Sequence, residues 1–189
     1  MANVVLASQS PRRRELLGRI FPEFEVIPSG VEEIADATSP EEYVTSLARA
    51  KAEDVASRLP RETLVIGSDT VVVLDGKILE KPADEADAFR MLSSMSGRVH
   101  EVYTGLAVCK DGACVTAFEV TKVRFRALSA DAISRYIASG EPMDKAGAYG
   151  IQQKGALLVK EIEGDYFNVV GLPLCKLSEV LESMGYTTL

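Results

Sequence analysis

The chain has 189 residues, of which 47% are hydrophobic and 26% are charged, and its net charge is −7 at pH 7. This size and balance indicate one soluble globular domain over residues 1–189. The acidic balance excludes long-range attraction to nucleic-acid polymers, and no apolar run approaches the roughly 20 residues of a membrane helix. The N-terminus lacks the basic segment of a secretory signal, so we expect a cytoplasmic protein.

The first segment predicts a strand over residues 3–8 that turns into a helix from Pro11 to about residue 19. Ser10 is a favoured N-cap, and proline fits the first helical position. Arg12, Arg13 and Arg14 follow in the first turn, where cations are unfavourable for the helix itself. They indicate a site for a strongly negative ligand such as a polyphosphate, although a solvated surface is the alternative.

A second strand is expected over residues 23–28, and two glutamates follow it closely. Glu32 and Glu33 are paired carboxylates, and with a nearby aspartate they could hold Mg²⁺ or Mn²⁺, which prefer oxygen ligands. A charged loop is the alternative.

The next helix opens with a capping box at residues 39–42 and carries an apolar stripe as far as Leu59. Lys51 falls on that stripe. A lysine that faces inward needs an anionic partner, or else its stem lies along the core while its ammonium reaches water.

Residues 64–73 form a nearly continuous apolar run, which predicts a strand inside the sheet. Asp69 interrupts this run, and a carboxylate there must be paired, hold a metal or titrate abnormally. Gly67 and Ser68 are small, which suggests space beside Asp69 for a ligand. A turn aspartate between two short strands is the alternative.

Asp75-Gly76 predicts a hairpin turn into a short strand at residues 77–80. The hairpin returns Lys81 to the end of the sheet where Asp69 lies. Pro82 ends the strand and exposes Lys81 to a cleft. By itself this is ordinary loop chemistry.

The remaining elements alternate between helices and strands, so the chain predicts an α/β protein with a mixed sheet flanked by helices. The expected elements are a helix from Asp84 to Gly97, two long strands hinged at Asp111-Gly112, a helix from Ser129 to Gly140, a strand over 155–162 and a helix over 174–184.

Two loops rich in small residues follow the long strands, at 144–152 and 164–173. Gly147 and Gly150 would let the backbone approach a flat ligand, and Gln152 offers both a donor and an acceptor. Either loop could also be a plain connection. The sequence has no Walker loop, no serine-hydrolase set and no zinc motif.

The three cysteines have no metal-binding spacing. Cys109 and Cys114 face each other across the Asp111-Gly112 turn, so a disulfide is conceivable. A reducing compartment favours two small apolar strand residues instead. Cys175 lies in an apolar helical run and is expected in the core.

Taken together, these segments resemble the Maf family of nucleoside triphosphate pyrophosphatases. The matching motifs span nearly the whole chain, and their combination is specific although each alone is weak. They are residues 8–13, Glu33, Lys51, 67–70, 79–82, 96–97, His100, 102–105, 144–152 and 168–173.

The resemblance implies an inosine-triphosphatase-like fold, with an elongated mixed sheet and a central cleft. It implies hydrolysis of a nucleoside triphosphate to the monophosphate and pyrophosphate with a divalent cation, and a homodimer. Arg12, Thr70 and Gln152 match the branch that acts on dTTP and UTP. We expect these three residues to select the pyrimidine base.

The chemistry of phosphoryl transfer assigns the other residues, because it requires positioning and neutralisation of charge. We expect Ser10, Arg13, Lys51 and Lys81 to bind the phosphates, and Arg14 to face solvent. Asp69 would accept a proton from the attacking water or hold the cation together with Glu33. The alternative is a nucleotide-binding regulator of cell division or septum formation that has no significant turnover.

Overall fold

The computed structural model describes residues 3–32 and 36–189, and the chain divides into two compact units. Unit 1 consists of the chain up to Asp69 together with Thr104–Glu119 and Gly171–Leu189, and unit 2 consists of Thr70–Tyr103 and Val120–Val170. The single domain over 1–189 stays a prediction. Glu33 lies outside the described residues.

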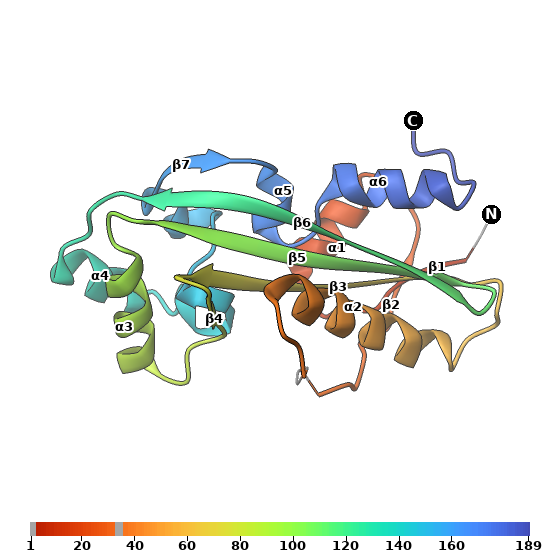
Figure 1. The fold of residues 1–189 in the computed structure, drawn as a ribbon, viewed down its shortest axis with the longest axis horizontal. Helices are drawn as coiled ribbons and strands as arrows, with labels where there is room; N and C mark the ends of the chain where they lie inside the picture. Colours follow the sequence, from red (N-terminus) through yellow and green to blue (C-terminus); the bar gives the residue numbers. More distant parts are fainter. Residues whose placement is uncertain (1–2, 33–35) are drawn as a thin grey trace. The chain divides into compact units, whose positions relative to one another are not determined.

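Within the described ranges, seven strands form a mixed sheet in the order β2-β1-β3-β5-β6-β7, and β4 pairs with β3 (Figure 1). The pairs of β1 with β2 and with β3 are parallel, whereas β3–β4 and β6–β7 are antiparallel. The strands are β1 (Val4–Leu6), β2 (Glu25–Val26), β3 (Leu64–Leu74), β4 (Lys77–Leu79), β5 (Val99–Lys110), β6 (Ala113–Phe125) and β7 (Val159–Glu163).

Unit 1 has helices on both faces of its strands, with α2 (Pro40–Ala56) on one face and α1 (Pro11–Leu17) and α6 (Leu174–Ser183) on the other (Figure 1). The predicted caps are confirmed: the Ser10 side chain accepts from the amide of Arg13, and the Ser39 side chain accepts from the amide of Glu42. The Glu42 carboxylate accepts hydrogen bonds from the amide and the hydroxyl of Thr38, which precedes the N-cap Ser39. The predicted capping box would instead have the amide of Ser39 as the donor.

Helix α2 packs very close to the strands because two strand residues have no side chain. A Cβ atom on Gly67 would lie 2.3 Å from the carbonyl oxygen of Ala48, and one on Gly105 would lie 2.2 Å from that of Val44. The prediction that Gly67 leaves space for a ligand is therefore wrong, since the helix backbone fills that space. The close approach brings the α2 stripe directly onto β3.

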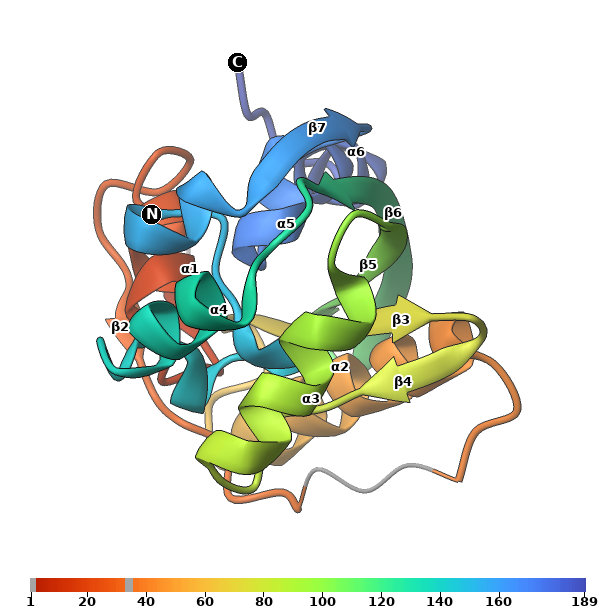
Figure 2. The ribbon, with the colours of Figure 1, turned by 90° about the vertical axis from the view of Figure 1, so that its left-hand side faces the viewer.

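Unit 2 contains α3 (Glu85–Met95), α4 (Ala130–Ile137) and α5 (Tyr166–Val170), together with three 3-10 turns, η1 (Glu141–Asp144), η2 (Ala146–Ala148) and η3 (Gln153–Leu157). Figure 2 shows α3 and the β3–β4 hairpin from the side of this unit. Asp75 and Gly76 both have positive φ, 52° and 74°, as the predicted hairpin turn requires. None of the helices in the described part of the chain is long and apolar enough to cross a membrane.

Two predicted elements of unit 2 are wrong in part. The strand expected over 155–162 begins only at Val159, because the residues before it form η3. The stretch 164–173, expected as a loop, contains α5. Both segments are short, and a helical turn of three to five residues leaves too little periodicity for the sequence to reveal it.

The cysteines differ from the prediction. Cys109 and Cys114 form a disulfide across the β5–β6 hairpin, where their Cα atoms are 4.1 Å apart. The prediction of two unpaired apolar residues at these positions is therefore wrong. Cys175 is exposed rather than buried, because α6 buries Leu177, Val180 and Leu181 and the cysteine lies on the opposite face.

Candidate functional site

The centre of the candidate site is an ion pair between α2 and β3 in unit 1. Lys51 Nζ lies 2.6 Å from Asp69 Oδ1, and the two side chains are only 10% and 9% exposed. Asp69 follows Gly67 by two residues and so points to the same face of the strand, toward α2. Of the alternatives that the sequence left open, the structure shows an inward Lys51 with an anionic partner and a paired Asp69 carboxylate.

The arginine of the first helical turn is held by two fixed contacts. Arg13 Nε donates to the carbonyl oxygen of Gly171 at 2.8 Å, and Arg13 Nη1 donates to Ser8 Oγ at 3.3 Å. The Ser10 side chain caps the same turn. The guanidinium is thus oriented before any ligand arrives, which favours recognition of a bound anion.

The carbonyl of Gly171 also connects this turn with the strand that carries Asp69. Ser68 Oγ donates to the Gly171 oxygen at 3.1 Å, and Ser68 directly precedes Asp69. Gly171 has φ of 121°, a conformation that favours glycine. Ser8, Ser68 and Gly171 therefore connect the first turn of α1, with Ser10 and Arg13, to β3 within unit 1. Lys51 and Asp69 pair on the face of β3 that α2 covers. The sequence motifs contain Ser8, Ser68 and Gly171, but sequence reasoning gave these residues no such contacts.

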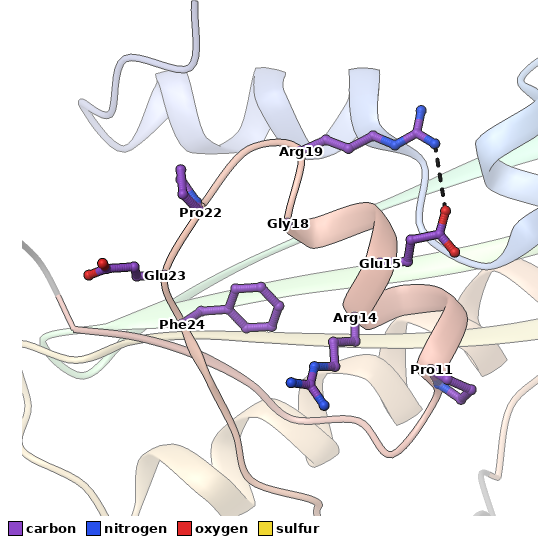
Figure 3. Close-up of a pocket in the computed structure, with 8 residues that line it drawn as sticks. All are labelled: Pro11, Arg14, Glu15, Gly18, Arg19, Pro22, Glu23 and Phe24. Atoms are coloured by element: carbon purple, nitrogen blue, oxygen red, sulfur yellow. Dashed lines mark ion pairs between the residues drawn. The ribbon is translucent and has the colours of Figure 1, made fainter.

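The three arginines have different environments. Arg14 is exposed and lines a surface hollow with Pro11, Gly18 and Phe24, and Figure 3 shows its side chain on the side of the Phe24 ring. An ion pair of Glu15 with Arg19 borders the same hollow (Figure 3). Arg12 is half-buried. The expected exposure of Arg14 is confirmed, and its hollow includes none of the residues predicted to bind phosphate.

Unit 2 carries the other predicted site residues. Thr70 follows Asp69 in β3 and is half-buried, whereas Lys81 is exposed after the end of β4. The antiparallel register pairs Val72 with Leu79, the last residue of β4, and Lys81 lies two residues beyond that pair. Gln152 is half-buried at the N-cap of η3.

The missing side chains of Gly147 and Gly150 make room for neighbouring side chains of the protein, and the approach of a flat ligand to their backbone stays a prediction. A Cβ atom on Gly147 would lie 2.8 Å from a methyl group of Val72, and one on Gly150 would lie 2.9 Å from the stem of Lys145. Protein side chains already fill both positions. The glycines serve the folding of the loop itself.

His100, the one histidine of the chain, lies in the core of unit 2 and is only 2% exposed. Its Nε2 is 2.7 Å from the hydroxyl of Tyr149, and both rings pack edge-on against Phe125. Burial lowers the pKa of His100 from 6.5 to about 4 and raises the pKa of the Tyr149 hydroxyl, so both groups are neutral at pH 7. Sequence reasoning matched His100 to a motif without giving it a role.

A divalent cation would find few protein ligands here. Among the described residues there is no group of three or more histidine, cysteine, aspartate or glutamate side chains placed to hold a metal. The carboxylate of Asp69 is buried in unit 1. Mg²⁺ commonly binds through one or two carboxylates together with substrate phosphates, so this arrangement fits a cation that arrives with a triphosphate.

Comparison with known proteins identifies the relatives of the chain. A family model described as Maf-like protein matches residues 3–184. A dTTP/UTP pyrophosphatase of Thermoanaerobacter sp. (strain X514) is 52% identical over 181 residues, which cover 95% of each chain. A dTTP/UTP pyrophosphatase of Thermococcus kodakarensis is 50% identical over 186 residues, which cover 98% of each chain.

Among solved structures, the Ham1 protein of Staphylococcus aureus has a similar fold. The TM-score is 0.55 at 19% sequence identity, and the match covers 96% of this chain and 99% of that one. This likeness concerns the fold alone and confirms the predicted α/β class with its mixed sheet. Since the family model spans nearly the whole chain and relatives share half of its residues, the chain belongs to the Maf family.

Proposed function

We propose that this protein is a nucleoside triphosphate pyrophosphatase that hydrolyses dTTP and UTP, and modified pyrimidine nucleotides, to the monophosphate and pyrophosphate. Such an enzyme would clear unwanted nucleotides from the cellular pool. The observation that carries the proposal is the buried pair of Lys51 with Asp69, in a chain half identical to proteins named dTTP/UTP pyrophosphatase.

In this proposal Asp69 is the proton acceptor. Water would attack the α-phosphorus, the bond to the bridging oxygen would break, and pyrophosphate would leave with the electron pair of that bond. Asp69 would take the proton that the water loses, or hold the cation. An ammonium has three N–H donors, so Lys51 can contact Asp69 and a phosphate oxygen together.

Charge neutralisation is the second requirement of the reaction. Ser10, Arg13, Lys51 and Lys81 are proposed to bind the phosphate oxygens. Arg13 supports this assignment best, because its guanidinium is already fixed by Gly171 and Ser8.

A divalent cation, Mg²⁺ or Mn²⁺, is proposed to bind at Asp69 and Glu33 together with the triphosphate. When bound, it would neutralise phosphate charge and polarise the phosphoryl group. The carboxylate of Asp69 supplies the oxygen ligand that such cations prefer.

The direct test is to mix the purified protein with UTP, dTTP, CTP or GTP and to measure pyrophosphate and monophosphate, with Mg²⁺, with Mn²⁺ or with EDTA. We expect one pyrophosphate per UMP or dTMP, and no product with EDTA. Release of inorganic phosphate instead, or no release at all, would contradict the proposal. Absence of turnover with tight nucleotide binding would favour the regulator of cell division, which the names of the relatives do not favour.

Base selection is proposed to involve Arg12, Thr70 and Gln152. Gln152→Glu replaces an amide donor by a carboxylate, so we expect the ratio of kcat/KM for UTP to that for CTP to fall by roughly tenfold. Gln153→Glu is the matched control, since it adds the same charge at the exposed neighbouring residue. An unchanged ratio in the Gln152→Glu protein would remove Gln152 from the selecting set.

The homodimer and the cytoplasmic location are parts of the same proposal. Light scattering of the purified protein would test the first, because a dimer would have twice the chain mass of 20.4 kDa. Fractionation of cells that express the protein at its natural level would test the second.

A further inference from the structure

The segment that carries Gln152 is tied down on both sides by two side chains of unit 2. Before Gln152, the amide of Gly150 donates to the hydroxyl of Tyr136 at 3.3 Å. After it, the amides of Lys154 and Gly155 donate to the carboxylate of Glu141 at 3.2 and 3.1 Å. Gln152 thus lies in a short bridge between two anchored ends.

The two anchors also bind each other. Tyr136 Oη donates to Glu141 Oε1 at 3.1 Å, and Tyr136 is buried on α4 while Glu141 begins η1. Burial raises the pKa of Tyr136, so its hydroxyl keeps its proton and remains a donor to the carboxylate. Tyr136 and Glu141 therefore form a hydrogen-bonded pair, which is here called the clamp.

The bridge needs such a clamp because its backbone is unfavourable on its own. Gln153 has φ of 51°, a left-handed conformation that is uncommon for a residue with a side chain. A Cβ atom on Gly155 would lie 1.7 Å from the carbonyl oxygen of Gly150, so the chain folds back tightly on itself. Such conformations persist only where the surroundings hold them, and they occur often at functional sites.

A third contact holds the clamp from the preceding turn. Lys145 Nζ donates to the carbonyl oxygen of Glu141 at 2.6 Å, and the stem of Lys145 packs against Gly150. Tyr136, Glu141 and Lys145, all in unit 2, thus hold the hydrogen-bonding groups around the bridge in place. A substitution at Glu141 would alter the position of Gln152 through the backbone of the bridge rather than through direct contact.

We propose that Glu141, together with Tyr136, is a positioning residue that fixes the Gln152 bridge and thereby sets the choice of base. This inference rests on the proposed function, since Gln152 selects a base only if the protein acts on nucleotides. Glu141 itself need not touch the nucleotide.

The first variant is Glu141→Gln, which keeps the shape but replaces one acceptor oxygen by an NH₂ donor. That donor would face an amide N–H, either at Lys154 or at Gly155. We expect the ratio of kcat/KM for UTP to that for CTP to fall roughly tenfold, mainly through a higher KM for UTP, because one of the two amides that hold the bridge loses its acceptor. Tyr136→Phe should lower the same ratio, and the double variant should lower it by less than the product of the two, because the residues act together.

Glu161→Gln is the matched control. It makes the same substitution in the same unit, at an exposed glutamate of β7 that pairs with Arg124. It should leave the ratio and the thermal midpoint unchanged.

A purely structural role of the clamp would slow hydrolysis of UTP and CTP by the same factor, and an equal loss on both substrates would overturn the inference. An independent readout is amide hydrogen exchange, which should become faster at Gly150, Lys154 and Gly155 in the Glu141→Gln protein. Unchanged exchange would also overturn it. A wild-type protein that releases no pyrophosphate from UTP would refute the proposed function instead, and the exchange measurement would still decide whether Glu141 holds the bridge.

Discussion

A buried polar pair of unit 1 and one of unit 2 differ in charge. In unit 1, Lys51 and Asp69 form an ion pair between a helix and a strand. In unit 2, His100 and Tyr149 form a neutral hydrogen bond inside an aromatic cluster with Phe125. Both pairs are almost fully buried, yet they suggest different purposes.

The difference teaches which buried polar groups point to chemistry. An ion pair loses much of its Coulomb attraction to desolvation, so stability alone is a weak reason to bury one. A neutral pair loses less on burial and can complete a core with satisfied hydrogen bonds. We therefore interpret Lys51–Asp69 as part of the reaction site and His100–Tyr149 as architecture that supports the loop before Gln152.

The largest expected effect is on turnover. Asp69→Asn keeps the size of the side chain but removes its capacity to accept a proton, so we expect kcat for UTP to fall by about a thousandfold, within the range of general-base catalysis. The circular dichroism spectrum should stay that of the wild type. Asp75→Asn is the control, because Asp75 pairs with Arg98 on an exposed hairpin and should keep full activity. An Asp69→Asn protein with near wild-type turnover would show that the ion pair is only structural.

The second effect is on stability. Lys51→Met keeps the apolar stem and leaves the Asp69 carboxylate buried without its cation, so we expect the free energy of unfolding in urea to fall by about 3 kcal/mol. Adding Asp69→Leu should recover most of this loss, because the second change removes the uncompensated charge. If the double variant is as unstable as Lys51→Met alone, packing rather than charge is the cause.

The third effect is a pH dependence that belongs to His100. The pKa of His100 is 6.5 in the unfolded chain and about 4 in the folded protein, so between these values the unfolded state binds more protons. Stability is therefore full above pH 6.5 and falls as the pH decreases toward 4, by about 3 kcal/mol in total from this group. Protonation would also leave Nδ1 with a hydrogen that meets no acceptor among the described residues.

His100→Gln tests this directly, because the glutamine amide can replace Nε2 toward Tyr149 and does not titrate. Urea unfolding at pH 7.5 and pH 4.5 should show a smaller difference for the variant than for the wild type. Equal differences in the two proteins would assign the pH dependence to other groups.

Much of the fold was predictable because local signals agree with one another. Ser10, Ser39, Asp84 and Ser129 each cap a helix, and the side chain of each accepts the expected amide hydrogen bond. The sequence missed α5 and the 3-10 turns because their few residues show no periodicity. It also misjudged Cys175, since one exposed residue in an apolar run is visible only once the helix has a buried face.

For the candidate site, the sequence predicted the charged residues but not the hydrogen bonds around them. A charged residue in an apolar pattern is a signal that the sequence contains, and it led to Lys51 and Asp69. The hydrogen bonds around these two residues are made by carbonyl and hydroxyl groups, such as Gly171 O and Ser68 Oγ. A pattern of residue types does not predict such hydrogen bonds. Glu141 was missed for the same reason, because its partners are backbone amides.

By itself, the sequence determined most of the helices and strands, four helix caps and the family, and it marked Lys51 and Asp69 as charged residues in apolar patterns, since each depends on residue types at short spacing. The tertiary structure decided how closely α2 lies on the strands, which carbonyl holds Arg13, that Cys109 bonds to Cys114, and which side chains hold the Gln152 bridge. These depend on contacts between residues far apart in the chain or on backbone groups that every residue shares, and so they appear only when the chain is folded.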